Sequence, residues 1–335
     1  MSAARVPSPP EAQRAAGRPL ARRFSLDLVL RYYIQLLLVV AVVVLGAIDE
    51  NFRSPDNLEN ILLQASFTGI GAAGMTLLII AGAFDLSVAG ILGTCGIALA
   101  LVAAAGHDGL AVGVALALGA GLGLVNGLAV TKMKIPAFIA TLGLMNVYLG
   151  LAFIATRGQV IGIESEALRF AGTEAVLGFL PIPFLVMLLV YAACALVLEK
   201  TVFGRQVRAV GSSGPAALAA GLPVDRVRIA CFVIVGLCTA IAGVLLSGEL
   251  SSANAIMASG YELGAIAVAV VGGTSLQGGS GTLFGSFTGA LFFAVINNAL
   301  NIFGVGAYWQ YVASGLLLVS AVGVQELRTY VREGN

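Results

Sequence analysis

A glycine-rich segment, GGTSLQGGSG at residues 272–281, is the stretch of this chain best suited to chemistry through its backbone. Backbone amides of such loops can hold a phosphate group. A nucleotide-binding P-loop needs GxxxxGK followed by Ser or Thr, and this chain contains no Gly-Lys dipeptide, so we do not expect ATP to bind here. We favour a sharp turn between two helices, with positive-φ positions that glycine fills at low cost. Gly281, Gly285 and Gly289 follow at intervals of four and predict close helix packing.

Asp85 is the second candidate for chemistry, in the sequence GAFDLSV at residues 82–88 between two apolar segments. A carboxylate within a membrane is a functional candidate by default. The alternative, which we favour, is an N-cap: Asp85 would accept backbone amides at the start of a helix that begins at Leu86, with Ser87 following.

A basic segment, FGRQVRAVGSSGPAALAAGLPVDRVR at residues 203–228, is the third candidate. Its small residues 214–220 predict a short helix, in which Pro215 suits the first turn and Gly221 can end the helix. Two interpretations stay open. The segment is an ordinary basic loop on the inner side, or its short helix lies along the membrane and docks on a cytoplasmic partner.

Uncharged polar residues lie inside several apolar segments, where most such residues join helices by hydrogen bonds. A subset could line a path for a hydroxyl-rich solute. Our candidates for that path are Thr141, Asn146, Asn297 and Asn298.

The elements that position these residues are apolar segments of membrane-spanning length. Residues 263–325 contain no Asp, Glu, Lys, Arg or His, and the whole chain is 59% hydrophobic and 10% charged. A helix needs about 20 apolar residues to cross a bilayer. Seven further charge-free segments have this length or nearly so: Tyr32–Ile48, Asn60–Phe84, Leu86–Gly106, Leu110–Thr131, Ile135–Thr156, Ala175–Leu198 and Ile229–Gly248. The chain is therefore predicted to be an all-α polytopic membrane protein.

Charge distribution predicts the orientation of these spans. With the N-terminus inside, 15 of the 18 Lys and Arg residues fall on the inner side, and Arg53, Arg157 and Arg169 fall outside. This count requires an even number of crossings, so the final apolar stretch must cross three times, near Tyr261–Ser275, Thr282–Phe303 and Tyr308–Gln325. We expect about ten spans, both termini in the cytoplasm, and a short or broken helix after Tyr261.

Three regions follow from this pattern. Residues 1–29, rich in Pro, Ala and Arg, predict a disordered cytoplasmic arm. Residues 30–326 form the membrane domain, which includes the cytoplasmic loop 199–228, and residues 327–335 form a cytoplasmic tail. With one histidine and four cysteines inside apolar segments, we expect no metal or other cofactor in this chain, and no basic patch with interleaved aromatics indicates nucleic acid as a partner.

Several motifs resemble the permease subunits of bacterial sugar ATP-binding-cassette (ABC) importers, the group with ribose, xylose, arabinose, galactose, inositol and autoinducer-2 systems. The resemblance runs from about residue 30 to residue 325. Its most specific pieces are AGAFDLSVAG at 81–90, IPAFIATLG at 135–143, FGRQVRAVG at 203–211, GYEL at 260–263, GGTSLQGGSGT at 272–282 and GALFFAVINNALNIFGV at 289–305.

The resemblance implies a type II importer-like bundle in the bacterial inner membrane, without catalytic activity or a nucleotide site of its own. It implies a second permease copy or paralogue, an ATPase subunit that binds Mg-ATP on the cytoplasmic side, and a periplasmic or lipid-anchored sugar-binding protein. It assigns coupling to the ATPase to Arg208, Gly211, Ser213, Gly214, Pro215, Ala216, Ala217, Gly221 and Arg226. It assigns family-motif or gating roles to Asp85, Leu86, Ser87, Gly272, Gly273, Thr274, Gly278, Gly279 and Gly281. Ser213-Gly214 stand where the family usually has Asn and then an acidic or polar residue, so the resemblance does not extend to a side-chain bond with the ATPase there.

Two other functions stay as alternatives. An ion-coupled secondary transporter generally keeps ionisable residues near mid-membrane, whereas here only Asp85, Glu249 and Glu262 lie near span ends. A branched-chain amino acid ABC permease belongs to the same superfamily, and the FDLS and GGTSLQGG pieces favour sugar over it. The sequence does not favour a membrane enzyme, because the predicted spans contain no paired carboxylates and no His-rich cluster.

Overall fold

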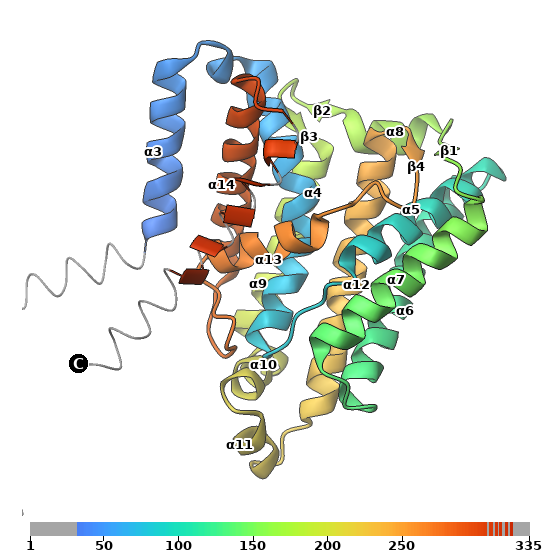
Figure 1. The fold of residues 1–335 in the computed structure, drawn as a ribbon, viewed down its shortest axis with the longest axis vertical. Helices are drawn as coiled ribbons and strands as arrows, with labels where there is room; N and C mark the ends of the chain where they lie inside the picture. The colour runs from blue at the N-terminus through green and yellow to red at the C-terminus, as the bar shows by residue number, and fades with distance from the viewer. Residues whose placement is uncertain are drawn as a thin grey trace, which may run out of the picture.

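The computed structural model describes residues 32–306 and, after them, residues 308–310, 312–313, 315–316, 319–320 and 322–323. The described part is a bundle of α-helices (Figure 1). Its first half contains α3 (Tyr33–Ile48), the short 3₁₀ helix η1 (Asn51–Arg53), α4 (Pro55–Ile80), α5 (Val88–Ala104), α6 (Asp108–Thr131), α7 (Ala137–Thr156) and α8 (Glu166–Thr173). Its second half contains α9 (Ile182–Lys200), α10 (Val202–Ser212), α11 (Gly214–Ala219), α12 (Val224–Glu249), α13 (Tyr261–Val271) and α14 (Leu283–Ile302).

The long helices pack as two groups. In the first, α4 contacts α9, α13 and α14, and α14 also contacts α3. In the second, α6 and α7 pack on α5, and α12 lies against both α5 and α6. Packing between α4 and α12 joins the two groups, so these two helices, of 26 residues each, form the centre of the bundle. The C-terminal half of α4 is buried from Gly69 to Ile80.

The predicted spans correspond to helices in the described part of the chain. Six of these helices, α4, α6, α7, α9, α12 and α14, are long and apolar enough to cross a membrane, and α3, α5 and α13 are shorter apolar helices. The predicted span 308–325 falls partly on residues outside the described set, and its described residues are helical. The count of ten spans, the position of the termini and the three-region division stay predictions, and residues 1–29 and 327–335 lie outside the described residues.

Two predicted span boundaries are wrong. The helix expected at 60–84 is α4 (Pro55–Ile80): Ser54 caps it through a bond from the Asn57 amide, and polar residues occupy its first turns. The helix expected at 175–198 is α9 (Ile182–Lys200). Residues 175–181, ahead of it, form a hairpin instead. The prediction missed this hairpin because a search for charge-free segments cannot locate a turn.

Four strands of two residues each modify the all-α prediction. Strand β2 (Ala175–Val176) pairs antiparallel with β3 (Leu180–Pro181), and β1 (Ile161–Gly162) pairs antiparallel with β4 (Ser252–Ala253). These strands and α8 lie at the end of the bundle opposite α10 and α11 (Figure 1). We call these two ends the α8 end and the α10–α11 end.

The segment between α12 and α13 departs most from regular helical structure. After α12 ends, residues 250–260 run without a helix, and α13 has 11 residues. At 1.5 Å per residue, α13 spans about 16 Å, roughly half of a bilayer's apolar thickness. The expectation of a short helix after Tyr261 is therefore confirmed. The glycines spaced by four at the start of α14 also pack closely as expected, since a Cβ on Gly285 would lie 2.0 Å from the Gly272 carbonyl oxygen.

Candidate functional site

The predicted loop 199–228 contains two helices, α10 and α11, between the end of α9 and the start of α12, where the sequence predicted one. Thr201 accepts a hydrogen bond from the Gly204 amide and caps α10, so the FGRQVRAVG motif is helical. At the next helix, the Ser213 hydroxyl accepts a bond of 3.3 Å from the Ala216 amide and caps α11, and Pro215 lies in its first turn. The Ser213 side chain is therefore used within the chain itself.

The end of α11 confirms the predicted glycine cap. Gly221 has φ 79° and its amide donates to the Leu218 carbonyl, while the Leu222 amide donates to the Ala217 carbonyl. These are the two bonds of a Schellman motif, which needs a residue with positive φ at this position. The cap ends α11 sharply after six residues.

Helix α11 stands out from the bundle at the α10–α11 end (Figure 1). Its Ala217 is buried, whereas Pro215, Ala216 and Leu218 are exposed, and Leu218 keeps 66% of its surface accessible. Arg226, at the start of α12, is also exposed. Helix α11 therefore buries only the small Ala217 and leaves the apolar Leu218 side chain on an exposed surface.

The C-terminal end of α10 meets two other chain segments backbone to backbone. A Cβ on Gly211 would lie 1.7 Å from the Ile80 carbonyl oxygen and 2.6 Å from the Gly279 amide nitrogen. That amide donates a bond of 2.8 Å to that carbonyl. Gly278 fits equally closely, since its Cβ would lie 2.8 Å from the Gly211 carbonyl oxygen. We call the contact of residues 80–82, Gly211 and residues 278–281 the glycine junction.

Two arginine side chains add hydrogen bonds to the glycine junction. Arg208 Nη1 donates to the Gly281 carbonyl at 3.1 Å, and its Nη2 lies 3.5 Å from a Glu199 carboxylate oxygen. Arg228 Nε donates to the Ala81 carbonyl at 3.4 Å. These contacts join α10 to the end of α4 and to the turn between α13 and α14.

The glycine-rich segment is the turn that the sequence predicted. Gly273, Gly278, Gly279 and Gly281 all have positive φ, and Gly272 ends α13 against the backbone of α14. Thr274 is fully buried, and its hydroxyl has no hydrogen-bond partner. The structure thus brings two of the predicted coupling residues, Arg208 and Gly211, into one contact with the predicted glycine motif.

Asp85 lies in a buried polar network between α4 and α5. Its Oδ1 accepts bonds from the Ser87 amide at 2.8 Å and the Ser87 hydroxyl at 2.7 Å, and its Oδ2 accepts from Asn126 Nδ2 at 2.7 Å. Tyr148 donates to Asn126 Oδ1 at 2.8 Å. The three ion pairs among the described residues do not involve Asp85. The polar partners of this carboxyl group in the described part are therefore hydrogen-bond donors and not cations.

The N-cap interpretation of Asp85 is wrong in position. Helix α5 begins at Val88 with Ser87 as its N-cap, and Asp85 accepts an amide bond ahead of the helix. The Leu86 amide donates instead to the Thr141 hydroxyl of α7 at 3.1 Å. Asn126 of α6 and Thr141 of α7 supply the long-range polar contacts, and those contacts cannot be read from local sequence.

The four residues proposed for a solute path lie in two places. Thr141 is buried beside the Asp85 network, and Asn146 is exposed on the same helix, α7. On α14, Asn297 is half-buried, and Asn298 exchanges two hydrogen bonds with Asn57 of α4, at 3.0 and 2.7 Å. Since α7 packs with α5 and α6 while α14 packs with α3, α4, α9 and α13, the structure does not gather the four residues.

Sequence reasoning missed the backbone partners of Gly211. Ile80 contributes its carbonyl oxygen, and Gly82 contributes a Cα atom that lies close to the other segments. Neither residue has a polar side chain that would mark it as part of a site. Gly82 has a positive φ of 79°. The glycine in the AGAFD motif is the one sequence signal that could have indicated this backbone turn. The described residues contain no group of three or more His, Cys, Asp or Glu that could hold a metal ion.

The fold and the site define a polytopic helical membrane protein with a protruding helix coupled to its core. The family described as "Branched-chain amino acid transport system / permease component" matches residues 57–322. The ribose import permease protein RbsC of Haemophilus influenzae is 38% identical over 297 residues, which cover 87% of this chain and 91% of that protein. RbsC of Bacillus subtilis is 38% identical over 291 residues, with 85% and 89% covered. The L-arabinose ABC transporter permease protein AraH of Azospirillum brasilense is 36% identical over 331 residues, with 98% and 96% covered.

The chain therefore belongs to the family of bacterial ABC importer permease subunits that includes these ribose and arabinose permeases. It is a multi-pass protein of the bacterial inner membrane. No solved structure matches the chain significantly.

Proposed function

We propose that this chain is the membrane-spanning subunit of an ATP-driven importer that moves a sugar or sugar-like polyol inward by alternating access. Mg-ATP would be bound and hydrolysed by a separate ATPase subunit. A second permease copy or paralogue would complete the path, and a periplasmic or lipid-anchored binding protein would deliver the solute.

The glycine junction is the observation that carries this proposal. Helix α11 offers an exposed surface at one end, and α10 connects it through Gly211 to the ends of α4 and α13. A partner that moves α11 on closing around ATP would therefore move helices at the centre of the bundle. ATP can shift an equilibrium between two conformations only through different affinities for them, and this connection supplies a physical route for that difference.

Charge supports a cytoplasmic position for the α10–α11 end. The helices and turns at this end carry Lys132, Lys134, Lys200, Arg205, Arg208, Arg226 and Arg228, and the Lys132 ammonium pairs with Asp225 at 2.7 Å. The three basic residues predicted outside, Arg53, Arg157 and Arg169, lie in or beside η1, α7 and α8. Excess Lys and Arg on one side of a membrane protein marks its cytoplasmic side.

The relatives' names favour a sugar as the solute. Ribose and arabinose are the sugars named for permeases that this chain resembles at 36–38% identity, although the family description names branched-chain amino acids. An amino acid zwitterion needs both charge signs at its site. The residues that line two hollows at the α8 end of the described part include one Glu and no Lys or Arg, which suits a neutral polyol better.

The test reconstitutes this chain with its ATPase and binding protein in vesicles and measures the initial rate of ATP-driven ribose or arabinose uptake. The variant Leu218→Asp introduces a charge on the exposed face of α11. Val202→Asp, at the first residue of α10 and 59% exposed, is the matched control. We expect Leu218→Asp to lose at least tenfold in uptake while the protein stays in the membrane, and Val202→Asp to stay within about twofold of the wild type.

Equal uptake by Leu218→Asp and wild type would remove the coupling role of α11. A protonophore added at fixed ATP tests the ion-coupled alternative. We expect no change in uptake, and a collapse would favour a secondary transporter.

A further inference from the structure

A non-helical segment, residues 251–260, is held firmly against the α8 end of the bundle. Strand β4 pairs with β1, and the Ile163 amide donates to the Ser251 carbonyl at 2.9 Å. A Cβ on Gly93 of α5 would lie 2.6 Å from the Ala255 carbonyl oxygen. Ala253, Ala255 and Ala258 of this segment are buried against the bundle, whereas Ile256 and Ser259 are exposed.

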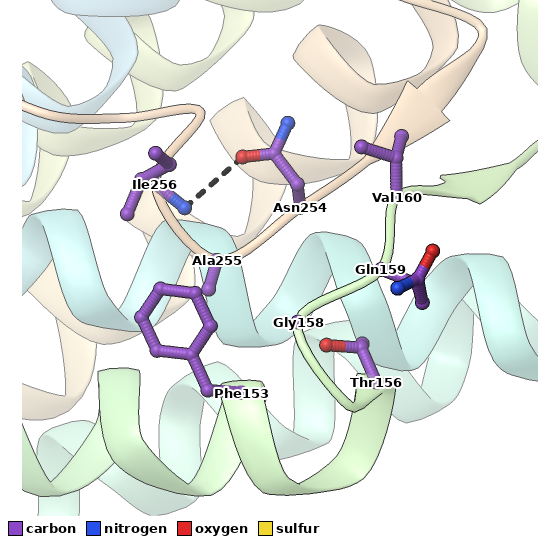
Figure 2. A pocket seen from close by; sticks show the side chains of 8 residues that line it. All are labelled: Phe153, Thr156, Gly158, Gln159, Val160, Asn254, Ala255 and Ile256. Carbon is purple, nitrogen blue, oxygen red and sulfur yellow. Dashed lines mark hydrogen bonds between the residues drawn. The ribbon is translucent and has the colours of Figure 1, made fainter.

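Two neighbouring hollows open between this segment and one face of α7. The larger has a volume of about 240 Å³ and is lined by Phe153, Thr156, Gln159, Asn254 and Ile256 among others. Figure 2 shows Phe153 and Thr156 of α7 facing the turn that carries Asn254 and Ile256. The smaller, about 130 Å³, shares Ala255 and Ile256 with it and extends to Met145, Ser259 and Glu262.

Glu262 brings an unused acceptor to the smaller hollow. Its Oε2 is buried and has no hydrogen-bond partner, and none of the ion pairs among the described residues includes it. Glu262 lies in the first turn of α13, and the Tyr261 hydroxyl beside it donates to the Phe67 carbonyl at 2.8 Å, which fixes the start of α13 on α4. Because Glu262 also lines the smaller hollow and a buried carboxylate oxygen without a donor is costly, a small side-chain rotation that turns this oxygen into the hollow would let it accept a hydrogen bond from a solute.

Asn254 brings a donor to the larger hollow. Its Oδ1 accepts a bond of 3.1 Å from the Ile256 amide, and this leaves its Nδ2 group available (Figure 2). The Phe153 ring adds an apolar face on the α7 side. Carboxylate, amide and aromatic groups together suit a small ring compound that has several hydroxyls on an otherwise apolar frame.

We propose that these two hollows form a contact site for a neutral monosaccharide on its way through the permease. Glu262 accepts a sugar hydroxyl, and Asn254 donates to a ring or hydroxyl oxygen. This inference rests on the proposed function. A volume of about 240 Å³ is below the range of about 300–1,000 Å³ usual for drug-sized ligands, so we expect one monosaccharide and not an oligosaccharide.

The test uses the complete reconstituted importer with ribose and a set of deoxyriboses, each lacking one hydroxyl. Uptake is measured for wild type, Glu262→Gln and Asn254→Asp, and ATP hydrolysis stimulated by the loaded binding protein is measured alongside. Asn254→Asp keeps the acceptor for the Ile256 amide and removes the donor. Glu249→Gln makes the same chemical change at the end of α12, away from the hollow-lining residues, and is the control.

We expect Glu262→Gln to lower ribose uptake about tenfold or more, as the loss of a hydrogen bond to a charged group would, with stimulated ATP hydrolysis retained. One deoxyribose should be carried equally by Glu262→Gln and wild type, because the hydroxyl that Glu262 accepts is absent. Unchanged ribose uptake in both variants, or an equal loss for every sugar, would overturn the site. Failure of the wild-type complex to use ATP would instead refute the proposed function, so the two failures differ.

Discussion

Gly211→Ala is the sharpest perturbation of the glycine junction. A Cβ there would lie 1.7 Å from the Ile80 carbonyl oxygen, and real Cβ atoms keep at least 3.0 Å from other atoms, so α10 and the end of α4 must separate by about 1.3 Å. That movement also strains the bond of 2.8 Å between the Gly279 amide and the Ile80 carbonyl. Losing the bond costs about 0.5–1.5 kcal/mol and overpacking about 1–3 kcal/mol.

We expect these terms to weaken the connection between α11 and the bundle by about 1.5–4.5 kcal/mol, where 1.4 kcal/mol corresponds to a factor of ten. The assay is sugar uptake per ATP hydrolysed in vesicles that contain the complete importer. Gly121→Ala, in α6, is the matched control, because no atom would lie within 4 Å of its Cβ. Gly211→Ala should transport at least tenfold less per ATP than Gly121→Ala. Equal coupling in the two variants would refute the reasoning.

Two further substitutions test the packing of the bundle. Tyr148→Phe removes the donor to Asn126 Oδ1 and should lower stability by about 0.5–1.5 kcal/mol, seen as a lower melting temperature in detergent; an unchanged melting temperature would mean that the bond contributes nothing. Gly285→Ala places a Cβ 2.0 Å from the Gly272 carbonyl oxygen and should reduce both melting temperature and uptake, whereas Gly113→Ala, with no atom within 4 Å of the added Cβ, should leave both unchanged. Matching behaviour of these two glycine variants would contradict the close packing of α13 on α14.

The helices and their caps could largely be predicted from sequence because their signals are local. Charge-free segments give most of the helices, since a charged side chain is costly in a bilayer. Pro215 and Gly221 predict the start and end of α11, and the structure has the expected Schellman bonds at Gly221. The same local method misplaces α4, because its first turns carry Asp56 and Glu59 outside the apolar segment.

The site could be predicted only in part, because its contacts join segments that are distant in sequence. Gly211 and Gly279 belong to motifs that the sequence singled out, yet their meeting at Ile80 depends on backbone packing. Asn126 of α6 donates to Asp85, Thr141 of α7 accepts from the Leu86 amide, and the hollow beside Glu262 depends on the course of residues 251–260. The path residues show the limit most clearly, since a polar residue type does not indicate which helices face each other.

The most direct measurement of the central claim is solute uptake by vesicles containing this chain, with and without its ATPase and binding protein. We predict that ribose or arabinose accumulates only when both partners and ATP are present, and that the purified chain alone hydrolyses no nucleotide. Uphill uptake by the chain without partners, or nucleotide hydrolysis by the purified chain, would contradict the account.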